Sequence, residues 1–191
     1  MNAKMTFKVV MPLVKKDCEV LTYSIEYLFR YLPVEELVII GAKNIQQNVQ
    51  ELKYRISFIN EDDMISKKKI EEIIESILPG DINAKKRSGW YLQQFLKMQY
   101  ACTCNDEYYL IWDSDTIPIR EVELFNENVP YMDMKKEYNK SYFETLKRLF
   151  PNLKKVCRGS FISEHMLIHT SSMKSLIYDI EANENIPGQF F

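Results

Sequence analysis

Near its middle the chain reads Tyr108-Tyr109-Leu110-Ile111-Trp112-Asp113-Ser114-Asp115-Thr116. The first five residues form an unbroken apolar and aromatic run, which is typical of a strand covered by helices on both faces of a sheet. Asp113 and Asp115 then follow the carboxyl end of this strand, where open α/β sheets bind their ligands. Their carboxylates suit Mg²⁺ or Mn²⁺, which prefer carboxylate, water and phosphate oxygens. The alternative is that Asp113-Ser114-Asp115 only begins a turn, because Asp and Ser favour turns.

The composition is that of one globular domain. The chain has 191 residues, of which 46% are hydrophobic and 27% charged, enough for a single core. Its net charge of −2 does not fit a nucleic-acid-binding domain, since those are usually strongly basic. We predict no transmembrane segment and a cytoplasmic location, because the sequence has no long apolar run and residues 1–8 lack the core of a signal peptide. The four cysteines should then be reduced thiols, and Cys102-Thr103-Cys104 fits small buried side chains better than half of a metal site.

The residues before the central strand predict one half of a doubly wound sheet. Three short apolar segments are expected to be strands: residues 7–12, 37–41 and 56–59. The first should end at Pro12, which cannot donate a ladder hydrogen bond. Helices are expected over residues 18–31, with Asp17 as N-cap, and over residues 66–77, before the breakers at positions 79 and 80.

A helix over about residues 89–102 should be largely buried, because it is apolar over much of its circumference. Trp90, Gln93 and Lys97 fall on one side of it at three- and four-residue spacing. Two interpretations of this line stay open. Either it faces a cleft, or the Lys97 ammonium extends to solvent from a partly exposed helix.

The residues after Asp115 predict a loop-rich crossover to Pro130, and then a helix that ends before Pro151. Between residues 134 and 158 there are eight basic residues and two acidic ones, a local charge of +6 in an acidic chain. This segment either attracts an anionic substrate or is a solvated face.

The last strand is expected over residues 161–169, followed by a helix to about residue 182. Glu164 and His165 interrupt this otherwise apolar strand. A carboxylate in a central strand is costly unless it is paired or functional, so both residues are candidates for an active site. His165 and His169 share a face of the strand, but a hydrogen-bonding role suits them better than a metal site without a third ligand.

Three blocks of this sequence resemble a largely uncharacterised bacterial glycosyltransferase-like family. They are Ser88-Gly89-Trp90-Tyr91-Leu92-Gln93-Gln94-Phe95-Leu96-Lys97, Trp112-Asp113-Ser114-Asp115-Thr116 and Phe161-Ile162-Ser163-Glu164-His165-Met166. A first strand that ends at Pro12 and an acidic cluster after the third strand are also similar to nucleotide-sugar-dependent glycosyltransferases of the GT-A fold. The resemblance implies a single Rossmann-like GT-A domain over residues 1–191, with a mostly parallel sheet and helices on both faces. Residues 1–115 would form its nucleotide-binding half and residues 116–191 its acceptor-side half.

The same resemblance implies roles for particular residues. Asp113 and Asp115 would bind Mn²⁺ or Mg²⁺ and, with Ser114, the diphosphate of a nucleoside diphosphate sugar. Glu164 and His165 would line the donor-sugar and acceptor pocket, where either could orient a hydroxyl or act as a base. The remaining donor contacts are implied at Pro12, Val14, Asn60, Asp62, Arg87, Trp90 and Lys97.

The predicted reaction is sugar transfer to a hydroxyl of a polysaccharide or lipid-linked acceptor. GT-A enzymes commonly carry a second acidic motif and a histidine further on, whereas only 22 residues follow His169, so we expect the domain to be C-terminally truncated. One alternative is a haloacid-dehalogenase-type phosphohydrolase with Asp113 as nucleophile, although Ile117 and the lack of a later Asp-Asp pair do not match that family. The other alternative is a non-catalytic nucleotide-sugar-binding module.

Overall fold

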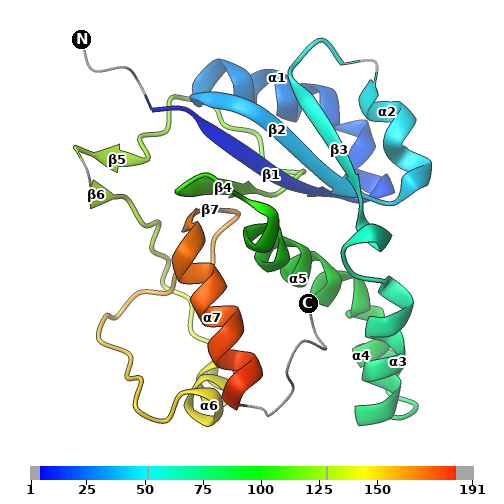
Figure 1. Ribbon diagram of the computed structural model, residues 1–191, viewed down its shortest axis with the longest axis vertical. Helices are drawn as coiled ribbons and strands as arrows, with labels where there is room; N and C mark the ends of the chain where they lie inside the picture. Colours follow the sequence, from blue (N-terminus) through cyan, green and yellow to red (C-terminus); the bar gives the residue numbers. More distant parts are fainter. Residues whose placement is uncertain (1–4, 51, 128, 184–191) are drawn as a thin grey trace.

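The protein is described by a computed structural model that covers residues 5–50, 52–127 and 129–183. Its centre is a five-stranded sheet of order β3-β2-β1-β4-β7 (Figure 1). The strands β1, β2, β3 and β4 are mutually parallel, and β7 is antiparallel to β4. Their bounds are Phe7–Leu13, Val34–Gly41, Ile56–Asn60, Tyr108–Trp112 and His165–His169, in chain order. The predicted mixed α/β fold with a mostly parallel sheet is therefore confirmed.

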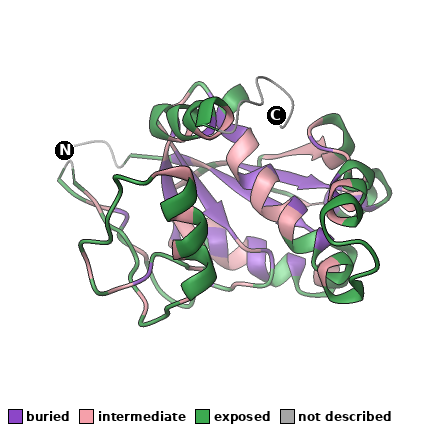
Figure 2. Ribbon diagram, turned by 90° about the horizontal axis from the view of Figure 1, so that it is seen from below, coloured by how far each residue is buried: buried purple, intermediate pink, exposed green. Residues whose placement is uncertain are grey.

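Helices cover both faces of the sheet. Successive side chains of a strand point to opposite faces, and in β1 both sets are apolar and need cover. Val9 and Met11 of β1 pack in one core cluster with α1 (Leu21–Tyr31) and α2 (Gln46–Gln50). Val10 packs in the other cluster, with α3 (Lys67–Ile77), α5 (Ser88–Thr103) and α7 (Thr170–Asn183). Figure 2 shows the buried strands between these helices, whose outer faces are exposed. The unbroken apolar run of β4 is thus explained by burial on both sides.

The remaining elements are short or lie outside the sheet. The 3-10 helices are η1 (Lys15–Glu19), η2 (Lys43–Ile45) and η3 (Glu61–Asp63), and α4 is Ile82–Lys86. The predicted crossover loop contains a two-stranded hairpin of β5 (Phe125–Asn126) and β6 (Val129–Pro130), which the sequence did not predict. The helix predicted before Pro151 is α6, Lys140–Leu149. None of the helices in the described ranges is long and apolar enough to cross a bilayer.

Two predicted boundaries are wrong at places that matter for the site. The first helix is not capped by Asp17: this residue lies in η1, and α1 begins after Val20, which supplies no side-chain cap. The last strand begins at His165 rather than Phe161, and it is an edge strand rather than a central one. The end of the chain, where we expected truncation, lies outside the described residues.

Candidate functional site

The strand order reverses between β1 and β4. From β1 the chain moves outward to β2 and β3, and then returns to β4 on the other side of β1. Such a reversal of strand order separates the loops that follow the two central strands and is where doubly wound folds bind ligands. Here those loops begin at Val14 after β1 and at Asp113 after β4. The structure thus brings the predicted acidic motif to the topological switch point.

A partly buried hydrogen bond joins the two loops across the switch point. The Ser114 hydroxyl donates to Oδ2 of Asp17 over 2.7 Å, and the two residues are 97 positions apart in sequence. Ser114 is almost fully buried. Asp17 is therefore not a helix cap but the partner that fixes the middle residue of Asp113-Ser114-Asp115.

Ser114→Ala is expected to destabilise the protein by about 1–3 kcal/mol, because it leaves the Asp17 carboxylate without this hydrogen bond. Urea unfolding should show a lower midpoint with an unchanged slope. Ser76→Ala is the matched control, since Ser76 is exposed on α3 and bonds only locally to the Ile73 carbonyl. Equal midpoints for the two variants would show that the loop-to-loop bond contributes nothing to stability.

Asp113 is held by both its backbone and its side chain. Its N–H donates to the Glu164 carbonyl over 2.9 Å, and its own carbonyl accepts from the Thr116 N–H over 3.0 Å. The second bond closes a turn, so the turn interpretation is correct for the backbone. The carboxylate Oδ1 accepts from Lys97 Nζ over 2.6 Å. The turn therefore presents an ion-paired Asp113 beside an exposed Asp115.

Lys97 is buried, with 8% of its surface exposed. Its ammonium does not extend to solvent, because α5 directs it to the carboxyl end of β4, where Asp113 compensates the buried charge. The Tyr109 hydroxyl donates to the Lys97 carbonyl over 2.9 Å and ties α5 to β4. The interpretation in which Lys97 extends to solvent is therefore wrong, while a cleft along the Trp90–Lys97 face stays a prediction.

Asp113 and Asp115 are the carboxylates of this turn, and they are the residues that could hold Mg²⁺ or Mn²⁺. The Lys97 pair involves Oδ1 of Asp113 only, and Asp115 is exposed. Over residues 5–50, 52–127 and 129–183, no group of three or more His, Cys, Asp or Glu could hold a metal. Mg²⁺ is commonly held by one or two carboxylates together with substrate phosphates, and Asp113 and Asp115 match that arrangement.

Glu164 lies just before β7, and its predicted setting in a central strand is wrong. Its side chain is 53% exposed and forms an ion pair with Lys135. The hydrogen bond from Lys135 holds the pKa of Glu164 below its usual range. Glu164 is therefore a partly exposed carboxylate that is ion-paired with Lys135.

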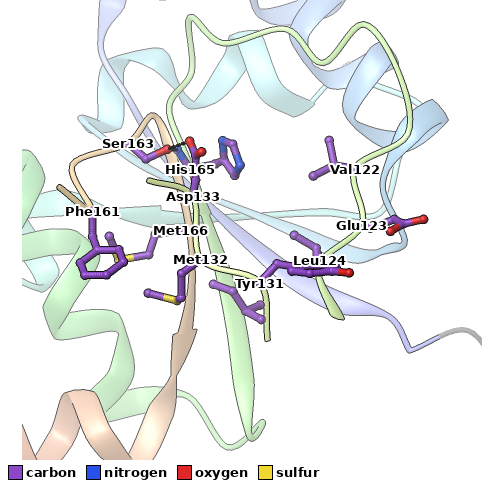
Figure 3. A pocket seen from close by; sticks show the side chains of 11 residues that line it. Val122, Glu123, Leu124, Tyr131, Met132, Asp133, Phe161, Ser163, His165 and Met166 are labelled. Atoms are coloured by element: carbon purple, nitrogen blue, oxygen red, sulfur yellow. Dashed lines mark hydrogen bonds between the residues drawn. The ribbon is translucent and has the colours of Figure 1, made fainter. Parts of the chain in front are cut away.

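His165 is opposite Trp112 in the β4–β7 ladder, and the two rings stack with centroids 4.9 Å apart. It lines a cavity of about 300 Å³ (Figure 3). Beside the His165 ring, the Ser163 hydroxyl donates to the Asp133 carboxylate over 2.8 Å. Tyr131, Met132, Phe161 and Met166 give the cavity its apolar lining. The cavity thus combines an imidazole and a carboxylate with aromatic and thioether surfaces.

The other predicted donor contacts lie farther from Asp113. Asn60 is at the carboxyl end of β3, and Arg87 and Trp90 are at the start of α5. Asn60 ends β3 and pairs with Gly41 of β2, about 14 Å from β4 at the usual strand spacing. Its Oδ1 is buried, with no hydrogen-bond partner in the described part of the chain. Arg87 lies over the Trp90 ring, 5.3 Å from its centroid, and both are exposed at the start of α5. With a rise of about 1.5 Å per residue, Arg87 is roughly 15 Å along the helix from Lys97.

A family model matches residues 6–186, which is nearly the whole chain. The chain belongs to DUF6492, a family of unknown function. No curated protein matches the sequence. Among solved structures, the apo crystal structure of mouse xyloside xylosyltransferase 1 matches this DUF6492 chain with a TM-score of 0.55 and 13% identity, over 97% of this chain and 76% of that chain. At this identity the match shows the fold alone, and it confirms a Rossmann-like α/β fold shared with that enzyme.

The structure of this DUF6492 chain brings some predicted site residues together and separates others. Asp113, Lys97, Glu164 and His165 lie around the end of β4. Lys97 donates a hydrogen bond to the Asp113 carboxylate, the Asp113 amide donates to the Glu164 carbonyl, and the His165 ring stacks on Trp112. Pro12 is buried within β1, and Val14 is exposed directly after the carboxyl end of this strand. Asp62 is exposed in η3, beyond Asn60. The sequence did not point to Asp133 or to the pairing of Asp17, because both act through contacts distant in sequence.

Proposed function

We propose that this chain is a metal-dependent glycosyltransferase domain of the GT-A fold. It transfers a sugar from a nucleoside diphosphate sugar to a hydroxyl of a polysaccharide or lipid-linked acceptor. The observation that carries the proposal is the position of Asp113 and Asp115 at the carboxyl end of β4, at the topological switch point. The likeness to a xylosyltransferase fold supports it. In this proposal residues 1–115 bind the nucleotide and residues 116–191 the acceptor.

The donor side uses the residues along the carboxyl edge of the sheet. Asp113 and Asp115 would hold Mg²⁺ or Mn²⁺ together with the diphosphate, and the ion would supply positive charge to offset the charge on the leaving nucleotide. Lys97 orients Asp113 through its 2.6 Å ion pair. The buried Oδ1 of Asn60 is an acceptor for a donor group of the nucleoside, since it has no partner among the described residues. Pro12, Val14 and Asp62 complete this edge, while Arg87 and Trp90 lie at the outer end of α5.

The acceptor side uses the cavity that His165 lines. His165 and the Asp133–Ser163 pair supply polar groups that can bind a hydroxyl, and Tyr131 and Phe161 supply flat apolar faces. Glu164 is ionised and partly exposed, so it can accept a proton or a hydrogen bond but cannot donate one. His165 and Glu164 are the candidates for orienting the attacking hydroxyl.

Calorimetric titration with uridine, guanosine and thymidine diphosphates tests this function. We expect at least one of them to bind in the presence of Mn²⁺ and to lose its binding heat when EDTA removes the metal, because the diphosphate and the carboxylates share the ion. The matched nucleoside monophosphate is the control and should bind more weakly, since it lacks the second phosphate. Absence of metal-dependent binding for all three diphosphates would contradict the proposal.

A non-catalytic nucleotide-sugar-binding module is the second candidate. It is favoured by one observation: the described residues offer two carboxylates but no third protein ligand at the site. Metal-dependent nucleotide binding without hydrolysis or transfer of any sugar nucleotide would select it. A phosphohydrolase with Asp113 as nucleophile would instead be trapped by beryllium fluoride as an aspartyl adduct.

A further inference from the structure

The helix α6 and the loop after it carry an apolar surface that the core does not cover. No residue of α6 is fully buried. A cavity of about 540 Å³ lies between α6 and residues 153–162, with an apolar lining that includes Tyr142, Phe143, Leu146, Leu153, Val156 and Ile162. Val156 is 96% exposed at the surface of this loop. In Figure 1 the segment is the yellow to orange part at the end of α7 remote from the sheet.

The same segment concentrates the positive charge of the protein. Residues 134–158 hold eight basic and two acidic residues, a charge of +6, while the whole chain has −2, so the other residues together carry −8. Seven of the eight basic residues are exposed, and Lys135 is half-buried. Two of these lysines pair with acids: Lys140 lies 3.4 Å from Glu144, and Lys135 pairs with Glu164. The apolar cavity is thus edged by cations in an otherwise acidic molecule.

The sequence of α6 separates these two properties onto different sides. Tyr142, Phe143, Leu146 and Leu149 recur at helical spacing and include the cavity-lining residues, while Lys140 and Lys147 are exposed. Lys155 lies over the Phe143 ring, 4.9 Å from its centroid, so a cation borders the apolar face directly. A helix with an aromatic and leucine face beside basic residues is typical of a segment that lies in a membrane interface.

We propose that α6 and residues 153–162 form a docking surface for an anionic lipid bilayer. The exposed side chains of Leu153 and Val156 enter the boundary between headgroups and acyl chains, and the surrounding lysines and arginines contact the lipid phosphates. Charge complementarity selects an anionic surface, and the protruding apolar loop selects a bilayer over a purely acidic partner. This inference does not rest on the proposed function. Phe161 lines both this cavity and the one that holds His165, so docking brings the candidate site close to the lipid surface.

Flotation of the full chain with lipid vesicles tests the proposal. We expect binding to vesicles of phosphatidylcholine mixed with phosphatidylglycerol, and at least about tenfold weaker binding to phosphatidylcholine alone, because each cation near an anionic surface adds to the affinity. High salt should weaken the binding to the mixed vesicles. Absence of binding to the mixed vesicles, or equal binding to both kinds, would overturn the proposal.

Two pairs of matched variants locate the surface. Replacement of Lys147, Lys154 and Arg158 by Gln should weaken binding by about 100-fold, whereas the same change at the exposed Lys68, Lys85 and Lys86 should have little effect. Val156→Glu should reduce binding, and Ile82→Glu, at another exposed apolar position, on α4, should not. These side chains are all exposed, so thermal unfolding should be unchanged.

If the control variants lose as much binding as the others, the attraction is a general charge effect and the assignment to α6 is wrong. Binding of an acidic protein without any binding to vesicles would also overturn it.

Discussion

Asp115→Ala is expected to abolish the metal-dependent binding of nucleoside diphosphates and to leave the thermal transition of the protein nearly unchanged. Asp115 is exposed in the turn after β4, so its removal disturbs little packing, and the change in the free energy of unfolding should stay within about 0.5 kcal/mol. As a direct metal ligand in the proposed site, it should cost more nucleotide affinity than the roughly 10- to 100-fold seen for residues that only orient ligands. Calorimetric titration and thermal unfolding of the same preparation measure both quantities.

The choice of Asp115 rather than Asp113 keeps this result interpretable. Removal of the Asp113 carboxylate would leave the buried Lys97 ammonium without its partner, which typically costs about 3–5 kcal/mol. Asp63→Ala is the control, because Asp63 is an exposed carboxylate in η3. If Asp115→Ala strongly lowers stability and leaves binding intact, Asp115 serves the turn and not a ligand.

Trp112→Ala is expected to lower the free energy of unfolding by about 3–5 kcal/mol. Trp112 is 1% exposed in the core between β1, α1 and the 116–124 loop. Its indole N–H donates to the Thr116 carbonyl over 2.8 Å, and its ring stacks on His165. The substitution therefore creates a cavity and also frees the turn that carries the acidic motif. Such a loss is a large part of the about 5–15 kcal/mol that stabilises a typical domain.

Urea unfolding followed by circular dichroism measures this effect without relying on tryptophan fluorescence. Trp90→Ala is the matched control, because Trp90 is the other tryptophan and is partly exposed at the start of α5. Trp112→Phe should fall between the two, since it keeps an aromatic ring but loses the hydrogen bond to Thr116, a loss of about 1–3 kcal/mol. If Trp112→Ala and Trp90→Ala unfold at the same urea concentration, the position assigned to Trp112 in the core is wrong.

The sequence predicted the features of this protein that depend on local pattern. The apolar run before Asp113 identified β4, and a general rule for parallel sheets placed a site at its carboxyl end. The helix around Lys97 was predicted to within one residue at each end, because its apolar residues and the flanking breaks are contained in one segment. These predictions did not require knowledge of the partner of any residue.

The parts that could not be predicted depend on contacts between distant segments. Asp17 has the residue type of a helix cap, and only the fold reveals its bond to Ser114. The pattern predicts a costly carboxylate at Glu164 because it predicts a central strand there. Glu164 instead lies just before the edge strand β7, and its side chain is about half exposed. Asp133 lies in a loop whose sequence has no periodicity, so the sequence does not indicate a role for it. Its place in the cavity depends on its hydrogen bond with Ser163, which is 30 positions away.

The position of β4 in the sheet also determines when the site can form during folding. β4 pairs with β1, and the Asp17–Ser114 bond closes a loop of 97 positions. The entropy lost in closing a long loop is not regained until its non-local contacts form, so such contacts slow folding and are made late. The strands β1 to β3 are contiguous in the first third of the chain and can pair before β4 is available. A chain leaving the ribosome therefore has a partial sheet first and gains the switch point only when β4 inserts beside β1.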